Sequence, residues 1–159
     1  ITLVKSRMGT ACHDSIERAW KDNYAPAMKA LGYPQNIIDK VMINPDPAEV
    51  TEDCIPVYME QRVERSLMGQ TITGKFDFVA EGRLEDFKTT TVYTWINDTN
   101  DEDYQLQGSI YRWLNPEIIT QDHMAIQFLF TAWIPGRAAT YPTYHDYPLM
   151  TRQIPLLSW

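Results

Sequence analysis

The strongest constraint on the fold is a region of alternating apolar and polar residues that runs from residue 57 to residue 90. Three segments in it, VYMEQRVERSL, QTITGKFDFVA and GRLEDFKTT, repeat with the period of two that is typical of strands. Two pairs between them, Gly69-Gln70 and Glu81-Gly82, are expected to form hairpin turns. The region therefore predicts an antiparallel meander of three strands.

Further elements are expected on both sides of the meander. A proline disturbs a helix, so the first helix is expected to end before Pro26 and the third before Pro116. The third helix presents an expected apolar face of Leu106, Ile110, Trp113 and Leu114. Expected helices cover residues 8–24, 34–42 and 103–114, and expected strands cover residues 123–134 and 152–157, the last at a sheet edge.

Composition limits the class of protein. With 159 residues, 44% hydrophobic and 12% aromatic, the chain can form one domain with a core, which argues against disorder. No apolar run reaches the ~20 residues that span a bilayer, so no membrane partner is expected. Cys12 and Cys54 fit neither a disulfide framework nor an iron–sulfur pattern, which favours the cytoplasm. Because the chain runs from Ile1 to an apolar end at Trp159, we expect a single domain truncated at both ends.

The predicted meander carries an unusual number of charges. Asp86 and Lys88 are two residues apart on one strand, so they share a face, and Asp77 lies on the neighbouring strand. Isolated charges are costly to bury, whereas two converging carboxylates suit Mg²⁺ or Mn²⁺. A lysine beside them can hold a water or stabilise developing negative charge. The net charge of −7 disfavours nucleic acid at long range but suits carboxylates that divalent cations neutralise.

Polar residues on two of the predicted helices also point toward the protein. On the first helix, with Met8 at zero, His13 lies near about 140° and Glu17 near about 180°, beside the apolar stripe. On the third helix, Gln107 and Tyr111 lie one turn apart on the flank of the apolar face. Each of these residues also has a structural alternative. His13 could be a core histidine, Glu17 could lie at the edge of the helix, and Gln107 and Tyr111 could simply flank a helix interface.

These residues resemble the RecB-like exonuclease branch of the PD-(D/E)XK nuclease superfamily. Four of its motifs occur in the family's order, and together they are far more specific than Asp-x-Lys alone. Three features depart from the superfamily. Phe76 stands in place of the proline of its PD motif, the iron–sulfur cysteines of some relatives are absent, and a further acidic ligand that some relatives carry upstream has no clear counterpart, with Glu60 as the candidate. The matching residues are Gly9, His13 and Glu17 in GTACHDSIE, Gly74 and Asp77 in GKFD, Asp86 and Lys88 in DFK, and Gln107 and Tyr111 in QGSIY.

The resemblance implies an α/β, restriction-endonuclease-like core: a mixed central sheet whose antiparallel meander carries the metal site, with helices on both sides. It implies that Asp77 and Asp86 bind Mg²⁺ or Mn²⁺ together with His13 and the backbone carbonyl of Phe87. Catalytic roles fall to Asp77, Asp86, Lys88, Gln107 and Tyr111. Glu17 and Glu60 are additional acidic candidates.

The implied activity is a metal-dependent deoxyribonuclease, of the exonuclease type, that hydrolyses DNA phosphodiester bonds in recombination, repair or phage replication. Its partners would be single- or double-stranded DNA and other recombination or replication proteins. It would act in the cytoplasm of a bacterial or infected host cell. The alternatives are a catalytically inactive nuclease-like domain that binds DNA or protein, and an ordinary α/β interaction module in which the motifs do not converge.

Overall fold

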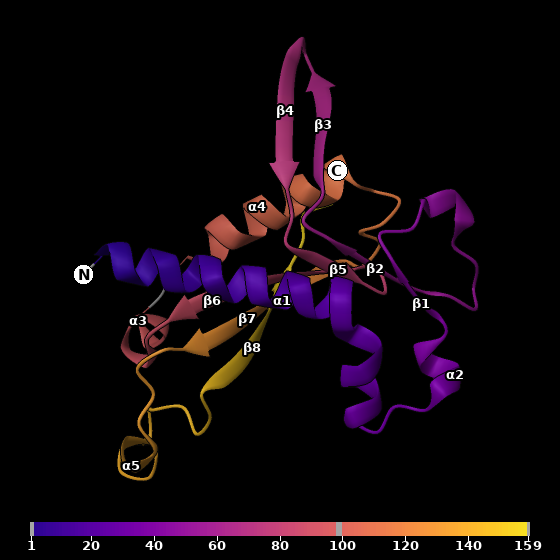
Figure 1. Cartoon of the computed structure of the whole chain (residues 1–159). Coiled ribbons are helices and arrows are strands. Elements are labelled where there is room, and N and C mark those ends of the chain that lie inside the picture. Colours follow the sequence, from indigo (N-terminus) through magenta and orange to yellow (C-terminus); the bar gives the residue numbers. More distant parts are fainter. Residues whose placement is uncertain (1, 98–99, 159) are drawn as a thin grey trace.

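The computed structural model of the chain describes residues 2–97 and 100–158, and it contains a mixed six-stranded sheet flanked by helices (Figure 1). The strand order is β1-β2-β5-β6-β7-β8. The expected α/β class is thus confirmed. The strands are β1 (Val41–Ile43), β2 (Ile55–Met59), β5 (Phe78–Ala80), β6 (Arg83–Thr90), β7 (His123–Phe130) and β8 (Leu149–Pro155). The helices are α1 (Thr2–Ala30), α2 (Gln35–Ile38), α3 (Val92–Ile96), α4 (Asp101–Leu114) and α5 (Pro135–Ala138), with a 3-10 turn at Pro47–Glu49.

Pairing in the sheet is antiparallel at its centre and mixed toward its edges. β5 pairs antiparallel with both β2 and β6, as a meander requires. β6 then pairs parallel with β7, and β7 pairs antiparallel with β8, which is the expected edge strand. No helix in the described part of the chain has the length and apolar character needed to cross a bilayer.

The first two strands of the predicted meander are each divided into two. A break at Glu60–Gln61 separates β2 from β3 (Arg62–Leu67), and a break at Phe76–Asp77 separates β4 (Gln70–Lys75) from β5. β3 and β4 pair only with each other and stand out from the main sheet as a hairpin (Figure 1). The alternation could not predict this division because the period of two continues on both sides of each break.

The two hairpin turns differ in how well they were placed. Glu81-Gly82 forms the expected turn, with φ of 50° and 78°. The other turn was predicted one residue too late: Leu67 pairs with Gln70, so the turn is Met68-Gly69, with φ of 50° and 78°. Positive φ at both central residues is the geometry that matches the twist of the flanking strands.

Two predicted helices were placed wrongly. α1 is interrupted by a kink at Asn23 (φ −145°), close to the expected end at residue 24, but the helix resumes there and continues to Ala30. A proline ring clashes with the carbonyl four residues before it, so the kink near Pro26 has a local cause. The helix expected over 34–42 is limited to α2, because Val41 and Met42 belong to β1 and pair with Ile55 and Pro56 of β2. The strand expected over 123–134 ends at Phe130.

Helices cover the two faces of the sheet, as expected. On one face, α1 packs Trp20, Tyr24 and Met28 against a cluster that includes Phe78 and Phe87. On the other face, a larger core is completed by α4. Its buried members include Phe76, Val79, Leu84, Met124, Ile126 and Phe128, with Tyr104 and Tyr111 of α4 packed against them.

The buried face of α4 is only partly the one expected. Leu114 is buried as predicted, but Leu106 is 50% exposed, and Gly108 and Ser109 are buried instead. A Cβ at Gly108 would lie 2.5 Å from Met124 Sδ and 2.8 Å from a methyl of Leu156. A residue without a side chain therefore allows α4 to lie close to the sheet.

Gly108→Val tests this close approach. The valine side chain would overpack the core, so we expect the free energy of unfolding to fall by about 1–3 kcal/mol in chemical denaturation. Gly136→Val is the matched control, because no atom lies within 4 Å of a Cβ at that position. Equal stability of the two variants would contradict the packing described for α4.

Candidate metal centre

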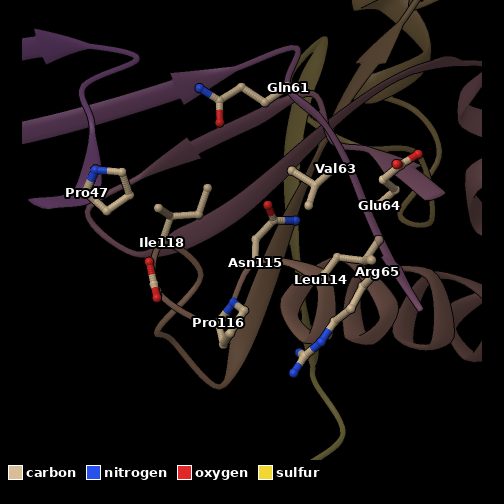
Figure 2. A pocket seen from close by; sticks show the side chains of 10 residues that line it. Pro47, Gln61, Val63, Glu64, Arg65, Leu114, Asn115, Pro116 and Ile118 are labelled. Atoms are coloured by element: carbon tan, nitrogen blue, oxygen red, sulfur yellow. The ribbon is translucent and has the colours of Figure 1, made fainter. Parts of the chain in front are cut away.

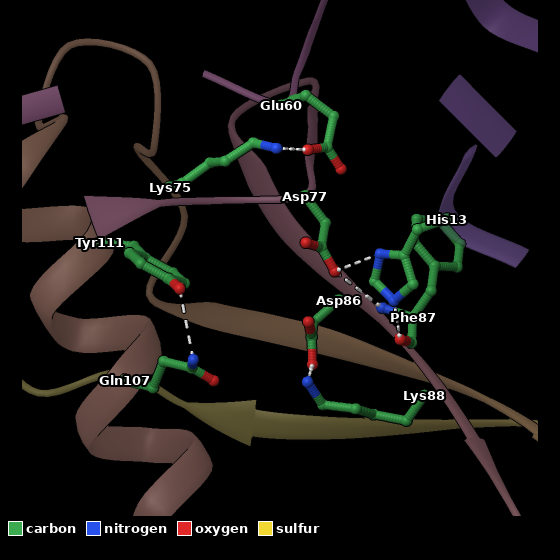
Figure 3. Close-up of polar contacts among 9 residues, drawn as sticks. All are labelled: His13, Glu60, Lys75, Asp77, Asp86, Phe87, Lys88, Gln107 and Tyr111. Carbon is green, nitrogen blue, oxygen red and sulfur yellow. Dashed lines mark hydrogen bonds and ion pairs between the residues drawn. The ribbon is translucent and has the colours of Figure 1, made fainter. Parts of the chain in front are cut away.

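The candidate centre lies where β5 and β6 separate. The pairing of β5 with β6 ends at Phe78 and Glu85, while β6 continues beside β7. Beyond that point the main chain of Phe87 meets side chains rather than a strand. His13 Nε2 lies 2.8 Å from the Phe87 carbonyl oxygen, and the Phe87 N–H points to Asp77 Oδ2 at 3.5 Å (Figure 3). The helix and the strand break thus both contribute to one site.

Asp77 is held at the centre by its neighbours in sequence. Phe76 is fully buried in the core beneath α4, whereas Phe78 is buried in the cluster beneath α1. Because the two phenylalanines are anchored on opposite faces, the residue between them is fixed at the end of the sheet. The Asp77 carbonyl also accepts a hydrogen bond from the Glu60 N–H (3.0 Å), which joins the two strand breaks.

His13 contacts two polar groups of the centre through its ring. Its Nε2 atom lies 2.8 Å from the Phe87 carbonyl, which can only accept a hydrogen bond, so the imidazole is the donor there. Its Nδ1 atom lies 3.2 Å from Asp77 Oδ2. His13 therefore links the backbone of β6 to the carboxylate of Asp77.

Asp86 and Lys88 project together, as predicted from their spacing. Asp86 is 9% exposed, and Lys88 Nζ lies 2.7 Å from its Oδ2 atom. This buried carboxylate is therefore neutralised by the ammonium of Lys88 rather than by water. Carboxylate oxygens are also the ligands that hard divalent cations prefer, so Asp86 can contribute to a cation site beside Asp77.

Burial and mutual repulsion shape the protonation of the centre. Burial, together with the adjacent Asp86 carboxyl, raises the pKa of Asp77 from 3.8 to about 7, although His13 opposes the shift. Burial lowers the pKa of Lys88, but the charges of Asp86 and Asp77 outweigh it and the net direction is upward. Burial and the same two carboxylates raise the pKa of Tyr111. Lys88 therefore stays cationic and Tyr111 stays neutral at pH 7.

The residues fit a hard divalent cation. Ligand atoms of His13, Glu60 and Asp77 all lie within 4.8 Å of one another. The Phe87 carbonyl oxygen adds a further possible ligand, 2.8 Å from His13 Nε2. Carboxylate and carbonyl oxygens predominate in this group, and these favour Mg²⁺ or Mn²⁺ over softer metals.

The structure separates the two additional acidic candidates. Glu60 belongs to the cluster, at the left-handed position (φ 55°) that ends β2. Glu17 does not: its carboxylate pairs with Lys21 at 2.5 Å, one turn further along α1. The helical phase placed Glu17 on the boundary of the buried face, and a lysine four residues later provides it with a local partner.

Gln107 and Tyr111 border the centre from α4. Gln107 Nε2 donates to the Tyr111 hydroxyl at 3.2 Å, and both side chains face Asp86 and Lys88 (Figure 3). Gly74 makes this possible, because a Cβ there would lie 2.6 Å from Leu114 and 3.0 Å from the Tyr111 ring. The glycine of the GKFD segment thus allows β4 to pass close to α4.

Lys75 was not predicted from the sequence and makes an ion pair with Glu60 (Figure 3). The only signal for it was its place between Gly74 and Phe76. A separate groove of about 450 Å³, lined by Gln61, Arg65 and Asn115 among others, lies between β3 and the end of α4 (Figure 2). That groove contains none of the predicted site residues.

Comparisons of the chain with protein-family models, with curated proteins and with solved structures found no match. The support for a function therefore comes from the residues and their geometry.

Cation binding is expected to depend on pH through Asp77. Its pKa of about 7 means that a cation must displace a proton below pH 7, so the apparent Mn²⁺ affinity should fall about tenfold per pH unit there and level off above. In the cation-free protein, the pKa of Asp77 is higher in the folded state than in the unfolded state. Protonated Asp77 therefore contributes to the free energy of unfolding in full below about pH 3.8, and this contribution is lost as the pH rises through about 7.

Thermal melting against Mn²⁺ concentration at pH 5.5, 7.0 and 8.5 measures both effects. Asp77→Asn should abolish the pH dependence of the Mn²⁺-induced rise in Tm. Asp53→Asn, at a 94% exposed side chain, should leave it intact. An equal rise at pH 5.5 and 8.5 in the unaltered protein would contradict the raised pKa of Asp77.

Proposed function

We propose that this protein is a metal-dependent deoxyribonuclease with a restriction-endonuclease-like core of the RecB-like branch, and that it acts as an exonuclease on DNA. The observation that carries the proposal is the convergence of Asp77, Asp86 and Lys88 where β5 and β6 separate, with Asp86 ion-paired to Lys88 and close enough to Asp77 to raise its pKa. His13 from α1 and the Gln107–Tyr111 pair from α4 border the same place. An interaction module with unrelated motifs would have no reason to bring them together.

The residues that would hold Mg²⁺ or Mn²⁺ are His13, Asp77, Asp86 and Glu60, with the Phe87 carbonyl. A bound divalent ion supplies an activated water and neutralises charge on the scissile phosphate. Because the pKa of Asp77 is raised to about 7, a bound cation would favour its ionised form. The other proposed roles, orienting the water and stabilising negative charge, would fall to side chains on the face of β6 that α4 covers.

Lys88 would act as a donor and a fixed positive charge rather than as a base. Its raised pKa keeps the ammonium protonated, so it can orient a water and stabilise negative charge that develops on the phosphate. Tyr111, also protonated, can donate to a phosphate oxygen, while Gln107 restrains its hydroxyl. Asp86 would bind both Lys88 and the cation and so fix their positions relative to each other.

Two variants separate cation binding from charge stabilisation. Asp86→Asn should remove both the Mn²⁺-dependent rise in Tm and cleavage of end-labelled linear DNA, the latter by on the order of 10³-fold. Lys88→Ala should keep the Mn²⁺-dependent rise, since Lys88 is not a ligand, while cleavage falls by about 10²–10³-fold. Linear and circular substrates, in Mg²⁺, Mn²⁺ or EDTA, report exonuclease action.

Matched controls come from the exposed Lys40–Asp53 pair, which is 3.6 Å apart and lies by β1 and the loop before β2. Asp53→Asn and Lys40→Ala should cleave DNA as the unaltered protein does. Full cleavage by Asp86→Asn, in a preparation free of other nucleases, would refute the mechanism. A protein that binds Mn²⁺ and DNA but never cleaves would instead indicate the inactive DNA-binding alternative.

A further inference from the structure

Lys75 lies between two features of the molecule, the metal centre and a groove. Its ammonium pairs with Glu60, a carboxylate whose side chain is only 16% exposed and which belongs to the His13–Glu60–Asp77 cluster. The negative charges of Glu17 and Asp77 also act on it. In the cation-free protein, Lys75 thus supplies the positive charge that a metal would otherwise supply.

The groove runs beside β4, between the β3–β4 hairpin and α4, and has a volume of about 460 Å³. Lys75, Arg62 and Thr73 line it from the hairpin, and Gln107 and Tyr111 line it from α4. Asp103, at the start of α4, contributes a carboxylate. Gln107 and Tyr111 therefore line the groove and also border the metal centre.

Two cations face each other at this groove. Arg62 and Lys75 are directly opposite in the β3–β4 ladder, so their side chains project from the same face. Like charges in such a pair destabilise a hairpin, and no ion pair of Arg62 is found among the described residues. Local arrangements that lower stability are characteristic of functional sites, and here the arrangement suits an anion.

We propose that Lys75 couples the binding of the cation to the binding of a DNA strand. A backbone phosphate in the groove draws the Lys75 ammonium away from Glu60, which frees the carboxylate for the cation. Conversely, a cation on Glu60 releases Lys75 to the phosphate. Such coupling is reciprocal, so each ligand tightens the other by the same factor. This inference rests on the proposed function, because it requires both a cation and an anionic strand.

The sign of the effect distinguishes this role from a merely structural one. Removing a cation from a metal-binding carboxylate should tighten metal binding, whereas loss of local structure should weaken it. We therefore expect Lys75→Met to bind Mn²⁺ about three- to tenfold more tightly than the unaltered protein when DNA is absent. It should also bind DNA more weakly and with a shallower salt dependence.

Titration calorimetry with Mn²⁺ provides the test, on the full chain, with and without a short single-stranded DNA whose phosphorothioate linkages resist cleavage. DNA should tighten Mn²⁺ binding by the unaltered protein several-fold and by Lys75→Met markedly less. Lys40→Met is the matched control: Lys40 is 43% exposed and is paired with a carboxylate, that of Asp53, which lies outside the cluster. It should bind Mn²⁺ as the unaltered protein does, with the same gain from DNA.

Melting without Mn²⁺ verifies that each variant is folded, and Lys75→Gln replaces Lys75→Met if the latter does not fold. If the unaltered protein binds Mn²⁺ and cleaves DNA but Lys75→Met binds Mn²⁺ no more tightly, the role of Lys75 is refuted and the nuclease remains. An equal gain from DNA in both proteins also refutes it. If the unaltered protein binds no Mn²⁺, the proposed function itself fails and this inference fails with it.

Discussion

Beyond Glu85, the main chain of β6 has no strand neighbour on its β5 side, and its peptide groups need other partners. His13 and Asp77 provide them at Phe87, from a helix on one face and from a strand break. Because side chains provide these hydrogen bonds in place of a strand, several polar side-chain atoms lie close together at a partly buried position. The candidate centre results from that separation of β5 and β6, because Asp86 and Lys88 approach the same place from the face of the sheet that α4 covers.

The two cores keep this opening in position. Phe76 and Phe78 point into opposite cores, so β4 must turn away from the sheet at Asp77. The β3–β4 hairpin therefore stands out from the sheet, and Gly74 allows it to pass α4 closely enough for Tyr111 to reach the carboxylates. Burial then raises the pKa of Asp77, which makes the centre a place where a proton and a cation compete.

Local patterns predicted the Glu81-Gly82 turn, the edge strand and the shared face of Asp86 and Lys88, because these depend on period and turn chemistry. The α/β class was implied by the family resemblance. Local patterns could not predict the breaks at Glu60 and Asp77, since side chains alternate equally on both sides of each break. The buried face of α4 was misjudged because hydrophobicity alone cannot reveal that Gly108 permits close packing and leaves Leu106 outside. Lys75 and Glu60 became partners through the hairpin register, which is a tertiary property.

The central claim is that a divalent cation binds where β5 and β6 separate. Anomalous diffraction from crystals soaked in Mn²⁺ tests it most directly. The account predicts a manganese peak in contact with Asp77, Asp86 and the Phe87 carbonyl, with His13 turned from Phe87 toward the ion. No peak at this position in Mn²⁺-saturated crystals, with His13 Nε2 still bonded to the Phe87 carbonyl, would contradict it.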